Sequence, residues 1–166
     1  MLIDPHIHTK EISKCASISI KDAIDYKISL GFSGAVLVNH CQPWYYKKED
    51  HLNEMKKHIE VFKEGLEYAK SKNFLLIFGI EVSLTKPSYA DYLIYGIDED
   101  FLLDSECLYD LTVEELHRYT LKHNCLLIEA HPFRDGCHIQ NPLHIDGVEL
   151  NAQLRDVIHK DEVIDY

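Results

Sequence analysis

The chain has 166 residues, 46% of them hydrophobic, which suits a single domain over residues 1–166 with a substantial apolar core. A formal net charge of −11 argues against extended nucleic acid or an anionic membrane surface as a partner, and is compatible with a small substrate held by bound cations. The five cysteines contain no Cys-x-x-Cys pair, so neither a disulfide framework nor a structural zinc knuckle is expected.

Short apolar runs alternate with longer amphipathic segments along the first half of the chain. The first predicted strand covers residues 2–8. A helix follows it, with Ser19 as the N-cap residue and Gly31 as the glycine at its exit. The next strand covers 34–40. Segment 50–72 then carries apolar residues at helical spacing with charges on the other face, which predicts the longest helix.

The second half continues this alternation. Four further apolar runs predict strands, at 74–82, 91–95, 125–131 and 146–151. Between them, Thr112-Val113-Glu114-Glu115 has the form of a capping box and opens a helix that runs to about His123. The order of elements predicts an α/β fold whose strands are joined by parallel crossovers.

Polar side chains follow several of these predicted strands, at the end where chemistry gathers in parallel α/β sheets. His6 and His8 are two residues apart on the first strand, so both imidazoles are expected on the same side, as two ligands of one metal require. Asp4 lies on the same face, where its carboxylate could orient an imidazole. The alternative is an incidental pair on a half-exposed strand.

Three later strands end in similar residues. His40 closes the second run, and Glu81 follows the third, where it could bridge two cations or form an ordinary salt bridge. His131 follows the run at 125–128, and Pro132 fixes the exit of that strand. Arg134 comes next, and its planar guanidinium could hold a phosphate bidentately or form a surface ion pair.

Taken together and in order, these motifs resemble the PHP family, the polymerase and histidinol phosphatase domain. They are Asp4-Pro5-His6-Ile7-His8-Thr9, Asn39-His40, Gly79-Ile80-Glu81, Ala130-His131-Pro132 and Gly147-Val148-Glu149-Leu150-Asn151. The resemblance covers nearly the whole chain. It implies a distorted (β/α) TIM-like barrel with six of about seven strands present, and hydrolysis of phosphate esters by a metal-activated water. It also implies two or three divalent cations, commonly zinc, manganese or iron, with His6, His8, His40, Glu81 and His131 as ligands and Glu81 bridging.

The chain departs from the family pattern at three places. Asp91 stands where members often carry a histidine, and a carboxylate can still be a ligand. Members also have an Asp or His several residues after the HxH pair. Here we favour Glu11 as the substitute ligand, with Cys15 as the alternative. The third departure is the absence of the Asp-x-His motif that usually ends the family domain, which His159 and Asp161 could replace if the tail folded back over the site.

An incomplete barrel leaves an open seam between strands, so a homodimer or a second, barrel-completing chain is an expected partner. The main alternatives are a catalytically weak metal-binding or regulatory module, and an amidohydrolase-type enzyme. The expected substrate is a small phosphorylated molecule. The N-terminus lacks the features of a signal peptide and no apolar run approaches the ~20 residues of a membrane span, so we expect a cytoplasmic protein.

The side chains around these motifs carry weaker signals. Trp44, Tyr45 and Tyr46 could line the mouth of the pocket or pack on the barrel rim. His138 and His144 are expected in a loop near Arg134. The other histidines are expected to be surface or helix residues, namely His51, His58, His117, His123 and His159.

Overall fold

The computed structural model describes residues 1–134, 136–139 and 141–150, so the tail residues His159 and Asp161 lie outside the described part. The strands of this part are β1 (Ile3–Ile7), β2 (Gly34–Leu37), β3 (His40–Cys41), β4 (Leu75–Leu84), β5 (Ala90–Tyr95), β6 (Leu126–Glu129) and β7 (Gly147–Val148). The α-helices are α1 (Ile20–Ser29), α2 (His51–Ser71), α3 (Glu99–Leu103) and α4 (Val113–Lys122). Single turns of 3₁₀-helix are η1 (Lys48–Asp50), η2 (Leu108–Asp110) and η3 (Pro142–His144).

The helix signals in the sequence are confirmed. The Ser19 side chain accepts a hydrogen bond from the Asp22 backbone N–H at the start of α1. Thr112 and Glu115 form both hydrogen bonds of the capping box at the start of α4. The five-residue helix α3 was not expected, because it is too short to show a helical period.

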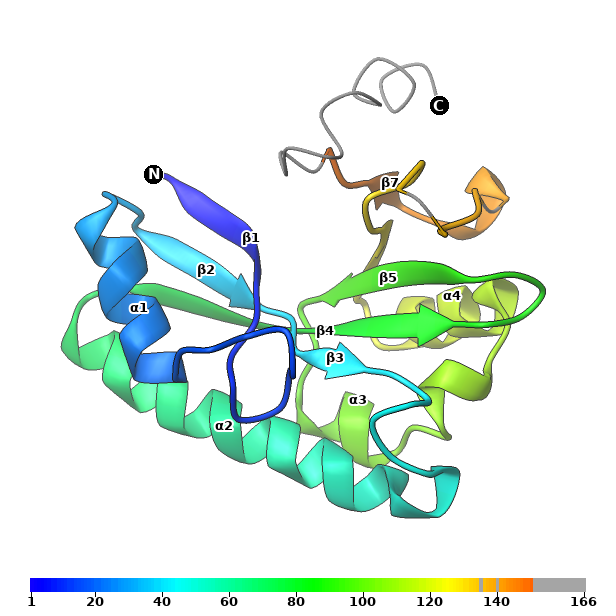
Figure 1. The fold of residues 1–166 in the computed structure, drawn as a ribbon, viewed down its shortest axis with the longest axis horizontal. Helices are drawn as coiled ribbons and strands as arrows, with labels where there is room; N and C mark the ends of the chain where they lie inside the picture. Colours follow the sequence, from blue (N-terminus) through cyan, green and yellow to red (C-terminus); the bar gives the residue numbers. More distant parts are fainter. Residues whose placement is uncertain (135, 140, 151–166) are drawn as a thin grey trace.

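The strands form one curled mixed sheet in the order β1-β2-β4-β5-β6-β7, with β3 also paired to β4 (Figure 1). The predicted strand at 34–40 is broken in two, and both pieces pair with β4 in parallel. The expectation of parallel crossovers throughout is wrong, because β5 is antiparallel to both β4 and β6. The connection at 85–89 is too short for a parallel crossover, which takes about a dozen residues.

The reversal of β5 determines where its ends lie. Because β5 runs against its neighbours, its first residues lie at the sheet edge where β4 and β6 finish. Asp91, at the start of β5, therefore shares an edge with residues at the ends of the parallel strands. We call this edge the ligand rim, and the edge where β2, β4 and β6 begin the opposite rim.

Four residues with positive φ mark the opposite rim. Gly31, Asn73 and Asn124 precede β2, β4 and β6, with φ of 84°, 53° and 55°. Gly96 follows β5 with φ of 80°. Glycine and asparagine reach this left-handed conformation more easily than other residues, so each supports a tight chain reversal.

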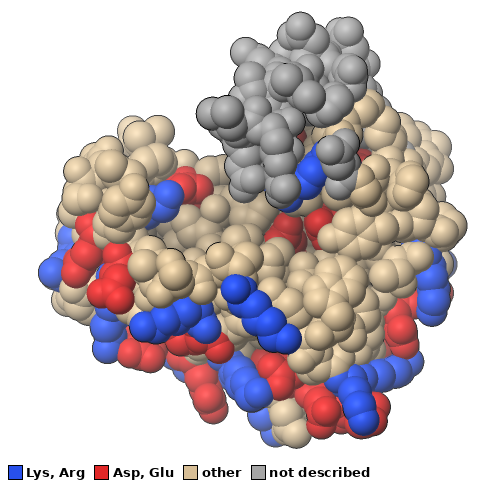
Figure 2. Space-filling model, viewed as in Figure 1, with Lys and Arg blue, Asp and Glu red and all other residues tan. Residues whose placement is uncertain are grey.

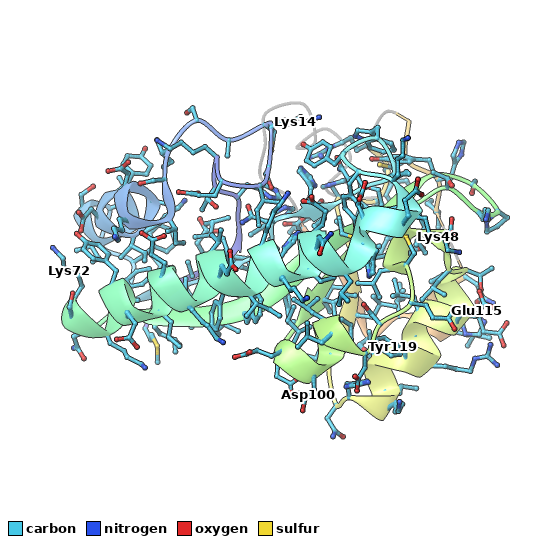
Figure 3. All side chains as sticks on the ribbon, turned by 90° about the horizontal axis from the view of Figure 1, so that it is seen from below. Lys14, Lys48, Lys72, Asp100, Glu115 and Tyr119 are labelled. Carbon is cyan, nitrogen blue, oxygen red and sulfur yellow. The ribbon has the colours of Figure 1, made fainter. Side chains whose placement is uncertain are left out.

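Helices cover the outer side of the sheet. Helix α2 is the long element across the lower part of Figure 1, and Figure 3 shows it running along one side of the molecule towards Lys72. It packs against α1 through Gly65, where an added Cβ would lie 2.5 Å from Ile20 Cγ1. Phe62 of α2 stacks on Phe78 of β4 with ring centroids 4.1 Å apart. The sheet is thereby held against α2 by a close-packed apolar layer.

The described surface carries charges of both signs. Figure 2 shows acidic and basic side chains interspersed over the visible face of the described residues. Among the helices described, none is long and apolar enough to cross a membrane.

Candidate metal centre

The HxH pair lies where strand period predicted it. His6 is on β1 and His8 follows it, and their Nε2 atoms face one another at 2.9 Å. Only one proton fits between two such nitrogens, so at most one can donate. Two imidazole nitrogens that point at the same space suit a shared cation.

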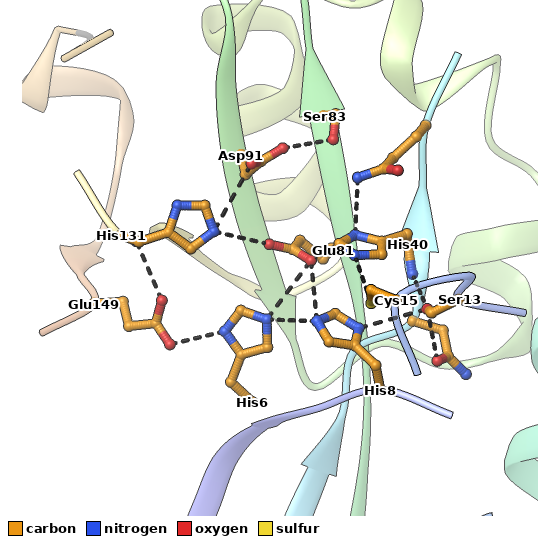
Figure 4. A network of polar contacts seen from close by, with 12 residues as sticks. His6, His8, Ser13, Cys15, His40, Glu81, Ser83, Asp91, His131 and Glu149 are labelled. Atoms are coloured by element: carbon orange, nitrogen blue, oxygen red, sulfur yellow. Dashed lines mark hydrogen bonds and ion pairs between the residues drawn. The ribbon is translucent and has the colours of Figure 1, made fainter. Parts of the chain in front are cut away.

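Glu81 lies at the centre of the candidate site, with 1% of its side chain exposed (Figure 4). It is inside β4, which continues to Leu84, and not at the end of a strand as expected. Its Oε2 atom lies 3.6 Å from His6 Nε2, 3.3 Å from His8 Nε2 and 2.6 Å from His40 Nδ1. None of these contacts has the geometry of a hydrogen bond to Oε2.

The second oxygen of Glu81 faces another histidine. Glu81 Oε1 lies 3.3 Å from His131 Nε2, so the carboxylate has imidazoles on both sides. Asp91 adds a carboxylate at this end, with its Oδ2 atom 3.8 Å from the same His131 nitrogen. Ser83 and Tyr89 hydroxyls donate to Asp91 at 2.5 and 2.8 Å and fix its position.

Backbone strain also occurs at this end of the site. His131 has a φ of 34° and Phe133 a φ of 68°, unusual values for side chains of this size. Such conformations cost of order 1–3 kcal/mol each and cluster at functional sites. The strain here places the His131 ring beside Glu81.

The pKa values of the histidines depend on their neighbours. Burial opposes a charge on His6, but the hydrogen bond to Glu149 and the nearby carboxylate of Glu81 outweigh it and raise the pKa of His6 to about 10. Contacts with Cys15 and Glu81 similarly outweigh burial at His40 and raise its pKa to about 9. At His8 burial dominates, with added repulsion from His40 and His6, and lowers the pKa to about 3.

The pKa values of the two buried carboxyl groups, Glu81 and Asp91, also depend on their neighbours. Burial favours protonation of Glu81, yet the contacts with His131, His40 and His6 hold its pKa well below the usual range. Burial and the charge of Glu81 raise the pKa of Asp91. The protein thus keeps an ionised carboxylate inside the sheet by surrounding it with imidazoles, an arrangement that a cation would also stabilise.

A carboxylate that the sequence did not single out orients the first histidine. Glu149 Oε1 accepts a hydrogen bond from His6 Nδ1 at 2.8 Å, and Glu149 Oε2 accepts one from the His131 backbone at 3.1 Å. Asp4 was expected to orient an imidazole, but it accepts from the His6 backbone and pairs with Lys27 at 2.5 Å. Glu149 lies in one of the sequence motifs that resemble the PHP family, and that motif could have pointed to it as a site residue.

A buried polar network supports the loop after the HxH pair. The Asn39 side chain accepts from the Thr9 backbone at 2.8 Å and from the Ser13 hydroxyl at 2.9 Å. The Ser13 hydroxyl in turn accepts from the His40 backbone at 3.0 Å. These residues tie the first loop to the start of β3, and fully satisfied networks of this kind hold a site rigidly.

The structure does not bring Glu11 to the other candidate ligands. Its side chain is exposed and accepts a hydrogen bond from the Ile20 backbone at 3.2 Å, at the start of α1. Cys15 is the residue of this loop that faces the cluster, with Sγ 3.4 Å from His40 Nε2. The loop therefore turns Cys15, and not the favoured Glu11, towards the cluster, and a ligand role for either residue stays a prediction.

The remaining predicted residues lie around the centre. Arg134 is half-buried in the loop after β6, and its backbone donates to the His131 carbonyl at 3.1 Å. The Tyr45 ring lies 5.9 Å from the His40 ring, whereas Tyr46 packs inward and its hydroxyl contacts His51 at 3.0 Å.

Two aromatic rings and two loop histidines lie further out. Trp44 is about half exposed and lies 6.0 Å from the Tyr89 ring. The His138 backbone donates to Tyr89, and the His144 ring lies 6.2 Å from that of His117.

A cavity of about 730 Å³ opens beside His6, between the first and last described strands. Its lining includes Asp4, His6, His8, Lys27, Tyr95 and Glu149. The hydrogen bond from His6 to Glu149 joins the two strand edges across it. Substrate-sized space is therefore present next to the imidazole cluster.

These side chains fit divalent cations. Three donor groups have atoms within 4.8 Å of one another, and they are His6-His8-Glu81, His8-Cys15-His40 and Asp91-His131-Cys137. The buried Glu81 oxygen without a hydrogen bond and the facing imidazole nitrogens are the features that a cation would satisfy.

Sequence comparison adds no family, since no family model matches the chain and no curated protein is significantly similar to it. Solved structures do match. The chain is similar to a two-domain protein from Bacteroides vulgatus that contains a predicted PHP-like metal-dependent phosphoesterase, with a TM-score of 0.70 and 19% identity over 98% of this chain and 47% of that one. The fold is of the PHP type.

Two other solved structures are similar in fold to this chain. A protein from Bifidobacterium adolescentis, assigned as a metal-dependent phosphoesterase, has a TM-score of 0.61 and 10% identity over 98% of this chain and 82% of that one. An amidohydrolase from Chromobacterium violaceum, with bound sulfate and no metal, has a TM-score of 0.64 and 12% identity over 99% and 83% of the two chains. This chain spans about half the length of the Bacteroides vulgatus protein, and its described strands form part of a barrel.

Proposed function

We propose that the chain is a metal-dependent hydrolase that cleaves phosphate esters at a centre of two or three divalent cations. The observation that supports this function is Glu81, a buried carboxylate with imidazole groups around both oxygens. A buried ion pair needs one partner, so four histidines around one carboxylate exceed any structural requirement. The likeness to proteins assigned as metal-dependent phosphoesterases also favours it.

The proposed cation ligands are His6, His8, His40, Glu81, Asp91 and His131. Mixed imidazole and carboxylate donors suit zinc, manganese or iron. Bound cations would lower the pKa of a coordinated water to about 7 and offset the charge of the phosphoryl oxygens.

The protein's own part is to position these groups and the substrate. Glu149 fixes the tautomer and angle of His6 by accepting from its Nδ1 atom. Ser83 and Tyr89 hold Asp91 by hydrogen bonds to its carboxylate. Arg134 would bind the substrate phosphate bidentately from the loop after β6.

Metal analysis and phosphatase assays together test the proposal. Wild-type protein loaded with zinc or manganese should retain at least two cations per chain after desalting and should hydrolyse p-nitrophenyl phosphate. Replacing His6 and His8 together by alanine should abolish both properties, while Glu11→Gln serves as the matched control that leaves them unchanged. Retained metal in the double variant would refute the assignment of these ligands.

The reaction class has its own test at Arg134. An amide-cleaving enzyme is the second candidate, favoured by the likeness to the Chromobacterium violaceum amidohydrolase. Arg134→Ala should raise KM for phosphate esters if the guanidinium binds phosphate. Turnover of amides with no turnover of phosphate esters would establish the second candidate instead.

The two end strands of the described sheet support a proposed partner. Strands β1 and β7 end the strand order and face one another across the cavity, joined by the His6 to Glu149 hydrogen bond. A homodimer or a barrel-completing chain would cover these edges. Light scattering of the metal-loaded protein should give a mass above that of one chain, and a monomer with full phosphatase turnover would contradict this. A cytoplasmic location stays a prediction.

A further inference from the structure

Two cysteines lie at opposite ends of the histidine cluster. Cys15 Sγ is 3.4 Å from His40 Nε2, and Cys137 Sγ is 3.8 Å from His131 Nδ1. Cys15 is exposed and Cys137 is half-buried, so both can meet a ligand from solvent. The other three cysteines are buried in the core, and they are Cys41, Cys107 and Cys125.

Each of these two sulfurs belongs to a group of donors that converge. Cys15 shares one with His8 and His40, and Cys137 shares the other with Asp91 and His131, in each case with all donor atoms within 4.8 Å. Zinc binds thiolate sulfur at about 2.3 Å and imidazole nitrogen at about 2.0–2.1 Å, which leaves two ligands of one ion about 3–4 Å apart. The Cys15 to His40 and Cys137 to His131 distances already lie in that range.

An independent observation points to a cation beside the first group. The Oε2 atom of Glu81, a side chain only 1% exposed, makes no hydrogen bond although it faces His8 and His40. Such an oxygen needs a positive charge beside it, and a bound cation is one way to supply that charge. His40 links this oxygen to Cys15, because its Nδ1 atom faces Glu81 and its Nε2 atom faces the Cys15 sulfur.

We propose that Cys15 and Cys137 are thiolate ligands, one at each end of the metal centre, and that the centre is therefore built for zinc or iron. The inference rests on the proposed metal-dependent function and names the class of metal it uses. Thiolates prefer soft or borderline cations, whereas manganese and magnesium prefer oxygen donors. Two sulfurs in a site of imidazoles and carboxylates would shift its preference away from manganese.

Cobalt substitution tests the two sulfurs directly. Cobalt(II) takes zinc-like sites, and a sulfur–cobalt bond gives a near-ultraviolet charge-transfer absorption that nitrogen and oxygen ligands do not give. The cobalt-loaded wild type should show this band. Cys15→Ser and Cys137→Ser should each lose about half of it, because each removes one of two sulfur bonds, and the double variant should lose it entirely while keeping the visible bands of bound cobalt.

The controls separate this inference from the proposed function. Cys107→Ala removes a buried thiol that belongs to none of the three donor groups and should leave the charge-transfer band unchanged. Cobalt that binds to the wild type without such a band, or a band that survives in the double variant, would overturn the inference and leave the metal centre intact. A single variant that keeps the whole band would remove that cysteine from the ligand set. Failure of the wild type to bind cobalt at all would contradict the metal centre itself.

Discussion

Glu11 and Cys15 belong to the same loop, and only their side-chain directions separate them. The Glu11 carboxylate accepts from the first backbone N–H of α1, one of the donors that a helix leaves unpaired at its start. The Cys15 sulfur instead faces His40. Spacing along a loop does not specify direction, so the sequence favoured the residue with the commoner ligand chemistry.

Glu11→Ala should therefore affect stability and not metal content. Losing a hydrogen bond to an unpaired helix N–H costs about 0.5–1 kcal/mol, which urea denaturation of the metal-free protein would measure. Glu11→Gln, which keeps an acceptor oxygen, should lie close to wild type. Loss of bound metal in the alanine variant would restore Glu11 as a ligand.

His58 is a buried histidine outside the proposed ligand set. Burial lowers its pKa to about 3, and charges on His51 and His40 act in the same direction. Below pH 6.5 the unfolded chain binds a proton here that the folded chain does not, so the free energy of unfolding falls as the pH falls towards 3.

Replacing His58 by leucine should remove this contribution. In metal-free protein, the variant's unfolding free energy should fall less steeply with acidification than that of wild type, by about 1.4 kcal/mol per pH unit inside the window. Met55→Leu, a repacking change on the same buried helix face, should keep the wild-type slope. Equal slopes for His58→Leu and wild type would show that His58 is protonated in the folded state.

At the scale of elements, the packing of α1 on α2 depends on Gly65. The added Cβ of Gly65→Ala would lie 2.5 Å from Ile20 Cγ1, and the Ile20 side chain is only 1% exposed. Alanine gains about 1 kcal/mol of helix propensity, but overpacking costs about 1–3 kcal/mol. We expect net destabilisation, because the added Cβ meets Cγ1, near the base of a buried side chain, which cannot move away without disturbing its neighbours.

Thermal or urea unfolding measures this balance. The double variant Ile20→Ala/Gly65→Ala should be more stable than Ile20→Ala alone, because the methyl group added at position 65 fills part of the space that the isoleucine leaves. Asn53→Ala, on the exposed face of α2, provides the control for propensity without packing. A stable Gly65→Ala single variant would mean that the two helices can separate at little cost.

Elements with local signals were predictable, and contacts between distant elements were not. The caps at Ser19 and Thr112 act within three residues, so the sequence contains the whole feature. The bond between His6 and Glu149 joins residues 143 positions apart, and no local pattern encodes it. The reversal of β5 was readable in principle, because the connection at 85–89 is too short for a crossover.

At the scale of the whole molecule, the proposed ligands connect segments that are far apart in the sequence. They come from β1, β3, β4, β5 and the loop after β6, so a bound cation would join all of these in the folded state alone. Ligands that bind only the folded state stabilise it by mass action. Metal and folding should therefore be coupled.

Chelation should lower the melting temperature. At a free zinc concentration a hundred times Kd, one site adds about 2.7 kcal/mol, which for a chain of this size is roughly 5–10 °C. Differential scanning calorimetry with and without chelator measures the shift, and Glu81→Gln should show a much smaller one. If the melting temperature of the wild type did not change when zinc was added, binding of zinc to the folded protein would be contradicted.

The four left-handed positions at the opposite rim set limits on how this sequence can vary. Gly31 and Gly96 have open space around an added Cβ, so φ alone restricts them, and Asn73 and Asn124 show that asparagine is accepted at such turns. Glycine and asparagine should thus be interchangeable there, while β-branched residues are excluded. Since this rim carries none of the proposed ligands, it is the place where inserted segments or reporter fusions can be added without disturbing the chemistry.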